Sequence, residues 1–279
     1  MISYIGGKSK IGRWIVDYYP TDMEVYLETF GGMLWCFFNM DLSKYANLNK
    51  VVYNDFNPLN SNLFKCVQNP NELQRALDSI QVQQFGVTNT PEEFKLKFID
   101  FQKEIFSDDF IINDTDYLVA AKYVYVLSQV FSGSKPETSS FIDLKGKYRS
   151  KYLSFRDKLS KPSWIEHFLK ITDVRNMDFQ DVIGEFDGKN TYIYLDPPYW
   201  RTENYYSNHD FDRGDHERLA KVLHQVESKF SLSYYDFELL HEWFPEDKYR
   251  WERKSFAKAA AAKKNTKQTM GEELLIMNY

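Results

Sequence analysis

The sequence has few cysteines and no long apolar run. Cys36 and Cys66 are the two cysteines in 279 residues, and their apolar surroundings argue against a disulfide framework or a cysteine-based zinc site. The most apolar stretch, Leu118 to Val130, contains Lys122 and is too short to span a bilayer. The first ten residues also lack the pattern of a secretory signal. These absences predict a soluble protein of a reducing cytoplasm.

The chain also lacks an excess of positive charge. Its 35 Lys and Arg residues against 40 Asp and Glu residues give a formal charge of −5, which argues against a polycation that coats nucleic acid without selectivity. The five histidines stand at no spacing typical of metal ligands, so we expect no metal site. Aromatic residues are plentiful at 17% and can fill a large core. The length allows one large domain or a domain with an insertion.

Short apolar runs, each closely followed by a carboxylate, predict three strands. These are Val25–Leu27 before Glu28, Lys50–Tyr53 before Asp55, and Thr191–Leu195 before Asp196. Further patterns predict helices over Leu34–Met40, Leu59–Val67 and His216–Val226, and strands over Phe230–Tyr234 and Glu273–Asn278. Alternating strands and helices are typical of an α/β fold with a mainly parallel sheet. Ligands of such folds bind at the carboxyl ends of the strands, where these acids stand.

The alternation lapses between residues 69 and 163. Pro91–Phe106 and Asp116–Gln129 carry helical patterns, and Ser132–Tyr152 has the composition of a loop. We therefore predict a mostly helical insert over residues 69–163, and a core formed by residues 1–68 and 164–279.

Two local stretches are basic within this acidic chain. Residues 135–161 hold eight basic residues against three acidic ones, and residues 248–267 hold eight against one. The second stretch is expected to be a mobile loop. Such stretches can contact DNA phosphates, although a solvated charged face explains them equally well without other motifs.

The tetrapeptide from Asp196 to Tyr199 has the sequence Asp-Pro-Pro-Tyr. The Asp196 carboxylate and the Pro197 carbonyl are hydrogen-bond acceptors, suited to an exocyclic amine that donates two hydrogen bonds. Tyr199 offers a stacking face for a planar base removed from its helix. A proline-rich turn after a strand is the competing interpretation of these residues alone.

Five motifs occur in a recognisable order. They are Tyr4-Ile5-Gly6-Gly7-Lys8, Glu28-Thr29-Phe30-Gly31-Gly32, Asn54-Asp55-Phe56-Asn57, Asp178-Phe179 and Asp196-Pro197-Pro198-Tyr199. Together they resemble the Dam-type (D12 class) DNA adenine methyltransferases over nearly the whole chain. The resemblance implies an α/β, Rossmann-like methyltransferase core with a helical target-recognition insert. It also implies S-adenosylmethionine as methyl donor and the N6 amine of adenine in double-stranded DNA as acceptor.

The resemblance also implies roles for individual residues. Asp196, Pro197 and Tyr199 would form the catalytic platform, and the cofactor would be bound by Tyr4, Gly7, Lys8, Glu28, Phe30, Gly31, Gly32, Asp55, Asp178, Phe179 and Asp196. Tyr4 and Lys8 would close over the methionine end, with the ammonium group meeting its carboxylate. Asp55 would bind the ribose hydroxyls, Asp178 the adenine amine, and Phe179 would pack against the adenine ring. The competing interpretation of Asp55 and Asp178 is that they cap the helices that follow them.

DNA contacts are expected from the insert and from the basic stretch near the C-terminus. The candidate residues are Ser132, Ser134, Lys135, Lys145, Lys147, Arg149, Lys254, Lys263 and Lys264. A polar-aromatic loop past the platform, with Tyr205, Tyr206 and Phe211, could close over the flipped base.

The resulting hypothesis is a site-specific adenine methyltransferase that acts by base flipping in a bacterial or phage-infected cell, in a restriction-modification or phage genome-protection context. Neither a metal nor a membrane is expected to take part. The amine of cytosine N4 or of RNA adenine is an alternative acceptor. A DNA-binding protein without catalysis is a third alternative, because Met33 and Leu34 stand where the family pattern continues a glycine-rich turn, and Thr29 replaces a proline.

Overall fold

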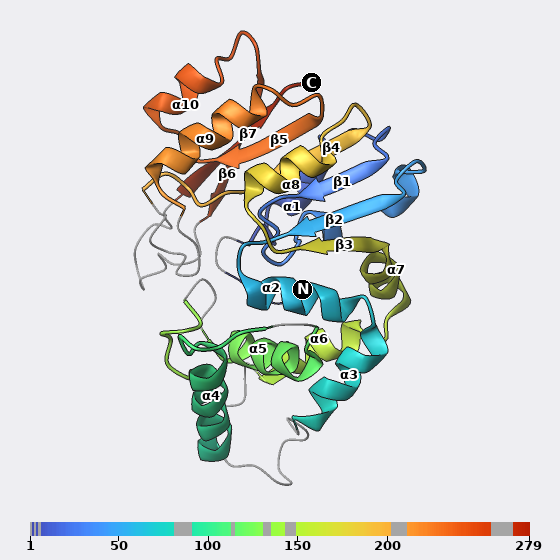
Figure 1. Cartoon of the computed structure of the whole chain (residues 1–279), viewed down its shortest axis with the longest axis vertical. Coiled ribbons are helices and arrows are strands. Elements are labelled where there is room, and N and C mark those ends of the chain that lie inside the picture. Colours follow the sequence, from blue (N-terminus) through green and yellow to red (C-terminus); the bar gives the residue numbers. More distant parts are fainter. Residues whose placement is uncertain are drawn as a thin grey trace.

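The computed structural model describes residues 2, 4, 7–80, 91–112, 115–130, 135–142, 149–201, 211–257 and 270–279. Seven strands within these residues form one sheet with the order β3-β2-β1-β4-β5-β7-β6 (Figure 1). They are β1 (Val25–Glu28), β2 (Lys50–Asn54), β3 (Ile171–Arg175), β4 (Thr191–Leu195), β5 (Lys229–Tyr234), β6 (Arg250–Ala257) and β7 (Met270–Met277). The first five pair in parallel, and β7 pairs antiparallel with β5 and β6. This doubly wound order confirms the predicted α/β, Rossmann-like class.

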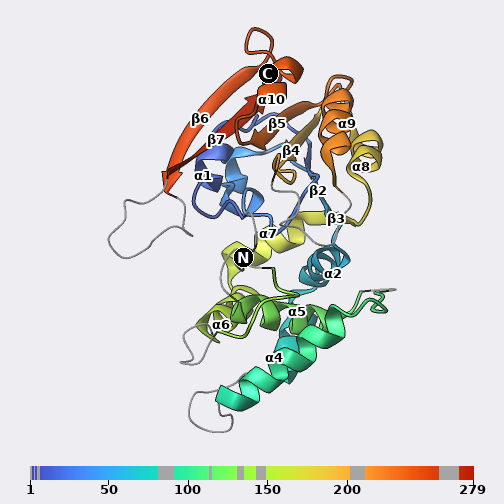
Figure 2. The same cartoon turned by 90° about the vertical axis from the view of Figure 1, so that its left-hand side faces the viewer.

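The helices of the described residues lie on both faces of the sheet and beyond one of its edges (Figures 1 and 2). They are α1 (Gly12–Val16), α2 (Pro58–Val67), α3 (Pro70–Ser79), α4 (Pro91–Ile105), α5 (Tyr117–Gln129), α6 (Arg149–Lys158), α7 (Pro162–Lys170), α8 (Phe179–Phe186), α9 (Arg213–Leu223) and α10 (Glu238–Trp243). Short 3-10 helices cover Phe37–Asn39 and Leu42–Lys44. No helix in the described ranges is both long and apolar enough to cross a membrane.

Alternation along the buried strands divides the apolar residues between the two faces of the sheet. Tyr26 and Tyr192 point into the core cluster that includes residues of α1 and α2, whereas their neighbours Leu27 and Ile193 join the cluster with α8 and α9. Side chains of successive strand residues point to opposite faces, so a strand buried on both faces is apolar at every position. The strands β1, β2 and β4 are therefore mainly apolar runs, and their acids appear where they end.

The helices α3, α4 and α6 pack against α5, which also contacts α2. The buried residues of α5, such as Tyr123 and Val124, belong to the same apolar cluster as Tyr53 of the sheet. The helical segment thus shares a continuous core with one face of the sheet. The division of the chain into an insert over residues 69–163 and a core of residues 1–68 and 164–279 stays a prediction.

Three local predictions were wrong. Leu34–Met40 forms no α-helix but a turn followed by a 3-10 helix, and Leu34 has a φ of +50°. Part of the expected loop Ser132–Tyr152 is helical, because α6 begins at Arg149. The basic stretch 248–267 is not simply a loop, since Arg250–Ala257 forms β6 and pairs with β7 along eight residues.

Candidate active site

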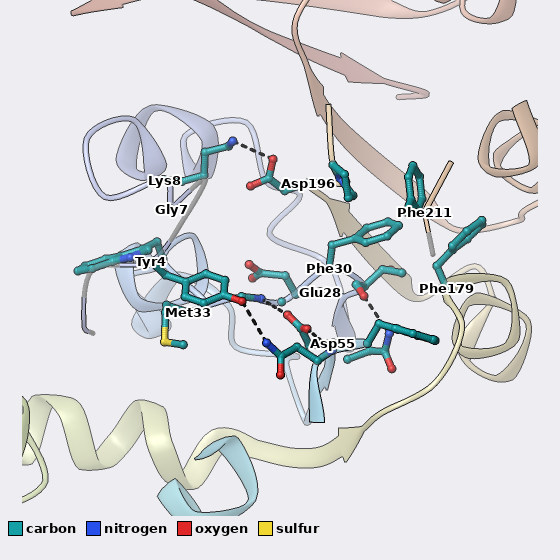
Figure 3. Close-up of a pocket in the computed structure, with 18 of the residues that line it drawn as sticks. Tyr4, Gly7, Lys8, Glu28, Phe30, Met33, Asp55, Phe179, Asp196 and Phe211 are labelled. Atoms are coloured by element: carbon teal, nitrogen blue, oxygen red, sulfur yellow. Dashed lines mark hydrogen bonds and ion pairs between the residues drawn. The ribbon is translucent and has the colours of Figure 1, made fainter. Parts of the chain in front are cut away.

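A cavity of about 330 Å³ opens at the carboxyl ends of β1, β2 and β4 (Figure 3). The predicted acids Glu28, Asp55 and Asp196 all line it. Each follows or ends an apolar strand, and the parallel register brings these three strand ends to one edge of the sheet. The structure therefore brings together the three carboxylates that the sequence placed at strand ends.

The turn after β1 forms the floor of the cavity. A Cβ atom added to Gly31 would lie 2.2 Å from Cε2 of Tyr53, and Gly32 has a φ of +46°. Both positions therefore require glycine, one for close approach and one for its left-handed backbone. The Gly32 amide donates to Asp55 Oδ2 at 2.7 Å, which ties the turn to the end of β2.

Asp55 organises the backbone around it. Its Oδ1 accepts from the Asn57 amide at 2.8 Å, and its Oδ2 accepts from Asn60 Nδ2 at 3.2 Å as well as from the turn. Burial raises the pKa of Asp55, while these donors oppose the rise. Asn57 itself caps α2 by accepting from the Leu59 amide at 2.9 Å. The residue that caps α2 is thus Asn57 and not Asp55, which lines the cavity.

Tyr4 and Glu28 add two polar side chains to the cavity wall. The Tyr4 hydroxyl accepts from Asn60 Nδ2 at 3.1 Å, and burial raises the pKa of Tyr4 to about 12. Glu28 is 3% exposed and accepts from the Tyr26 hydroxyl at 2.5 Å. Burial, with the nearby charge of Asp196 adding to it, raises the pKa of Glu28 well above its usual range. Gly7 lies beside Trp35, with room for no more than a tight Cβ contact at 3.1 Å.

The tetrapeptide after β4 meets the N-terminal segment. The Lys8 ammonium lies 2.8 Å from Asp196 Oδ1 and donates to the Tyr199 hydroxyl at 2.6 Å, and Figure 3 shows it turned toward Asp196. Asp196 borders the cavity, whereas Tyr199 and Pro197 are buried behind it. Burial raises the pKa of Asp196, and the Lys8 ammonium opposes that rise. Lys8 therefore contacts the platform itself; its expected contact with a cofactor carboxylate stays a prediction.

Aromatic rings gather at the opposite end of the cavity. Phe30, Phe179 and Phe211 lie within 5.6 to 5.9 Å of one another by ring centroid (Figure 3). The Arg218 guanidinium lies 4.0 Å from the Phe179 ring centre. It also donates to both carboxylate oxygens of Asp178, at 2.6 and 2.8 Å. This end can accept a flat ring between apolar faces and polar groups.

Asp178 has two roles in this arrangement. Its carboxylate caps α8 by accepting from the Gln180 amide at 2.8 Å, and it borders the cavity. The hydrogen bonds from Arg218 lower the pKa of Asp178. The helix-cap interpretation of this residue is confirmed, and its expected contact with an adenine amine stays a prediction.

Two buried oxygens on the cavity wall have no hydrogen-bond partner among the described residues. They are Oγ1 of Thr29, in the turn after β1, and Oε1 of Glu137, from the segment between α5 and α6. A buried polar atom without a partner is costly, so each one favours a ligand or water that supplies the bond. Both atoms belong to residues that line the same cavity.

Sequence reasoning missed four charged residues of the site. Asp215, Arg218 and Glu137 line the cavity, and Glu273 of β7 contacts Lys8 behind it. None carried a recognisable motif: Asp215 directly precedes a predicted helix that contains Arg218, Glu137 stands in a predicted loop, and Glu273 opens a predicted strand. The clustering arises from the fold, which joins segments far apart in the chain.

The predicted DNA-binding residues do not line the cavity where the structure describes them. Lys135 is half-buried, Lys254 is exposed on β6, and Arg149 is the first residue of α6. The remaining candidates lie outside the described residues, as do Tyr205 and Tyr206; these candidates are Ser132, Ser134, Lys145, Lys147, Lys263 and Lys264. No group of three or more His, Cys, Asp or Glu residues that could hold a metal ion occurs in the part of the chain that is described.

Comparison with known proteins gives a family and several relatives. The model of the D12 class N6 adenine-specific DNA methyltransferase family matches residues 4–258. The chain is 25% identical over 215 residues to the modification methylase StsI of Streptococcus sanguinis, covering 74% of this chain and 29% of that protein. It is 23% identical to the type II methyltransferase M.FokI of Planomicrobium okeanokoites, covering 100% and 42% of the two chains. The chain thus spans less than half the length of these two relatives.

A third relative has nearly the same length. The chain is 25% identical over 299 residues to the type II methyltransferase M.MjaIII of Methanocaldococcus jannaschii, and the alignment covers 100% of this chain and 98% of that protein. Among solved structures, the rRNA methyltransferase aviRa from Streptomyces viridochromogenes aligns over 98% of this chain and 85% of that one. Its TM-score of 0.37 at 10% identity is too low to support any conclusion.

Proposed function

The chain belongs to the D12 class N6 adenine-specific DNA methyltransferase family, and we propose that it transfers a methyl group from S-adenosylmethionine to the N6 amine of a flipped adenine at a specific site in double-stranded DNA. The observation that carries this proposal is the position of Asp196. Its carboxylate stands at the end of β4 and borders a cavity of about 330 Å³ that also contains the glycine turn after β1. A hydrogen-bond acceptor for an amine and a glycine turn that can bind a cofactor therefore lie in the same cavity.

The cavity wall fits S-adenosylmethionine in its chemistry. The two buried oxygens without partners, Thr29 Oγ1 and Glu137 Oε1, favour a ligand with donors and positive charge. Tyr4, Gly7, Lys8, Glu28 and the turn Phe30–Gly32 would hold the methionine part, Asp55 the ribose, and Asp178 with Phe179 the adenine. S-adenosylmethionine would supply the methyl group, already activated on a sulfonium.

The platform orients the acceptor amine. Asp196 and the Pro197 carbonyl would each accept one hydrogen bond from N6, which keeps the lone pair of the nitrogen free to attack the methyl carbon. Such positioning can contribute about 7–11 kcal/mol of the barrier reduction. Asp196 need not remove a proton beforehand, because the nitrogen becomes far more acidic once methylated. It then accepts the proton that leaves, while Tyr199 packs behind it.

The DNA duplex would be bound outside the cavity. Exposed basic residues such as Lys254 on β6 can meet phosphates, and the candidates of the insert and the C-terminal stretch would extend that contact. The relatives named as type II methyltransferases or modification methylases favour a restriction-modification or genome-protection context for this chain, in the cytoplasm of a bacterial or phage-infected cell.

A methylation assay tests the proposal. Purified protein is incubated with S-adenosylmethionine and unmethylated genomic DNA, and the DNA is digested to nucleosides for mass spectrometry. We expect N6-methyladenine from the wild type and from the control Asp247→Ala, whose side chain is exposed and does not line the cavity. Asp196→Ala should make none while retaining cofactor binding.

Other outcomes would replace the proposal. N4-methylcytosine as the product, or methylation of RNA adenine alone in a direct competition between RNA and DNA duplexes, would change the acceptor. DNA binding without binding of S-adenosylmethionine would indicate a DNA-binding protein without catalysis. Wild-type turnover by Asp196→Ala would remove the assigned role of that carboxylate.

A further inference from the structure

A second carboxylate stands behind the catalytic platform. Glu273 of β7 is 1% exposed, and its Oε1 lies 3.2 Å from the Lys8 ammonium. The antiparallel register pairs Leu274 with Tyr234, the last residue of β5, so Glu273 lies just past the carboxyl end of β5. It therefore reaches the same edge of the sheet as Asp196, from a strand about 75 residues later in the chain.

Lys8 and Tyr199 join the two carboxylates of Asp196 and Glu273 into one cluster of contacts. The Lys8 ammonium donates to the Tyr199 hydroxyl at 2.6 Å, and that hydroxyl donates to Glu273. Lys8 also contacts both carboxylates, Asp196 at 2.8 Å and Glu273 at 3.2 Å. The orientation of the hydroxyl is therefore fixed by an ammonium on one side and a carboxylate on the other.

Among the described ion pairs, Asp196 and Glu273 share the single ammonium of Lys8, so these charges do not balance when both carboxylates are ionised. One buried ammonium is shared by two carboxylates, although a single ion pair would satisfy it. Buried ion pairs contribute little net stability and an extra buried charge is costly. The second carboxylate is therefore better explained by the chemistry of the neighbouring platform than by folding.

We propose that Glu273 is a positioning residue for methyl transfer, which holds the Lys8 ammonium and the Tyr199 hydroxyl in place behind Asp196 and adds a second negative charge beside it. This inference rests on the proposed function. By drawing part of the ammonium's charge away from Asp196, Glu273 leaves the cluster with a net negative charge. A negative site stabilises the positive charge that develops on the nitrogen when it is methylated.

The pH dependence follows from the groups around Glu273. In the described part of the chain these groups are Lys8 of the N-terminal segment, Tyr194 of β4, Asp196 and Tyr199 past β4, Tyr235 past β5, and Lys254 opposite it in β6. Burial raises the pKa of Glu273 and Lys8 lowers it, while Asp196 raises it further. Because two like charges disfavour each other, removing the charge of Glu273 lowers the pKa of Asp196. The acid limb of the kcat profile should then move to lower pH.

The variant Glu273→Gln tests the proposal, with Glu272→Gln as its control. Glu272 precedes it in β7 and is exposed. In Glu273→Gln we expect kcat to fall on the order of 10²-fold, the acid limb to move to lower pH, and the Kd for S-adenosylmethionine measured by calorimetry to stay within about threefold, since the group lies behind the wall. Glu272→Gln should match the wild type in all three.

A folded Glu273→Gln variant with wild-type kcat and an unshifted profile would overturn the proposal. Glu273→Asp keeps the charge but shortens the side chain, so its kcat should fall while its acid limb stays in place. Wild-type kcat in Glu273→Asp would therefore also overturn it, even where Glu273→Gln fails to fold. Failure of the proposed function is distinct, because then the wild type itself makes no N6-methyladenine.

Discussion

Replacing Gly31 by alanine tests whether the turn after β1 is held by close packing. The new Cβ would lie 2.2 and 2.6 Å from two ring carbons of Tyr53 and 2.9 Å from the Asn54 carbonyl. Tyr53 has little freedom to move, because it is fully buried, stacks on Phe64 at 4.2 Å and donates to the Gly32 carbonyl at 3.0 Å. Overpacking of this kind costs about 1–3 kcal/mol.

That cost should appear in both stability and cofactor binding. At about 2–4 °C per kcal/mol for a chain of this size class, we expect the Tm of Gly31→Ala to fall by about 2–12 °C. Moving the turn also separates the Gly32 amide from Asp55, so the affinity for S-adenosylmethionine should fall about tenfold or more, in line with a loss of about 1.4 kcal/mol. Scanning calorimetry and titration calorimetry measure the two effects.

Gly184→Ala is the matched control. Gly184 lies in α8, and a Cβ added there meets nothing within 4 Å. Because alanine is a better helix former than glycine by about 0.8–1.0 kcal/mol, this variant should be slightly more stable than the wild type and bind the cofactor equally well. A Gly31→Ala variant with wild-type Tm and cofactor affinity would refute the packing argument.

Three further predictions concern the cavity wall. Glu137→Gln, which keeps the shape and removes the charge, should weaken binding of S-adenosylmethionine several-fold in titration calorimetry, and unchanged affinity would show that Glu137 makes no contact with the cofactor. Arg218 lowers the pKa of Asp178 in the folded protein. At pH values above the ordinary carboxyl pKa of about 3.9, this pair therefore stabilises the folded protein, and the stabilisation is lost as the pH falls through the lowered pKa. Arg218→Met should therefore flatten the fall in Tm on acidification, and an identical slope in both proteins would contradict this. Behind the wall, Tyr199→Ala removes the hydroxyl that Lys8 and Glu273 hold beside Asp196, so its kcat for methyl transfer should fall, and a wild-type kcat in the folded variant would argue against that support.

The central strands were predictable because burial on both faces leaves a clear signal. Val25–Leu27, Lys50–Tyr53 and Thr191–Leu195 are short apolar runs, and all three lie in the strands of the structure. The acids that follow them had to fall outside the apolar layer, so their positions at the sheet edge followed from the same signal. Their convergence on one cavity needed only the parallel order of the strands.

The errors arose where burial and charge did not follow a simple period. Leu34 to Met40 is apolar nearly all round because the segment fills a gap between α1 and the sheet, and the left-handed backbone at Leu34 breaks the helix pattern. The strand β6 was missed because an edge strand leaves its basic residues exposed, as Arg253 and Lys254 are. Glu273 was predicted as the start of a strand but missed as a site residue, because only the pairing of β7 with β5 brings it to the sheet edge beside Asp196.

The cavity itself is acidic, and under the proposed function its charges would separate a cationic cofactor from a polyanionic substrate. Among the described residues that line it, two are basic and six are acidic. Arg218 is paired with Asp178 and Asp215, and Lys8 with Asp196 and Glu273, so each cation is outnumbered by the carboxylates it contacts. Under the proposed function, such a wall would attract the sulfonium and ammonium groups of S-adenosylmethionine and repel phosphate. The DNA backbone would then stay on the basic surface outside, and an uncharged base removed from the duplex would be the part that approaches Asp196.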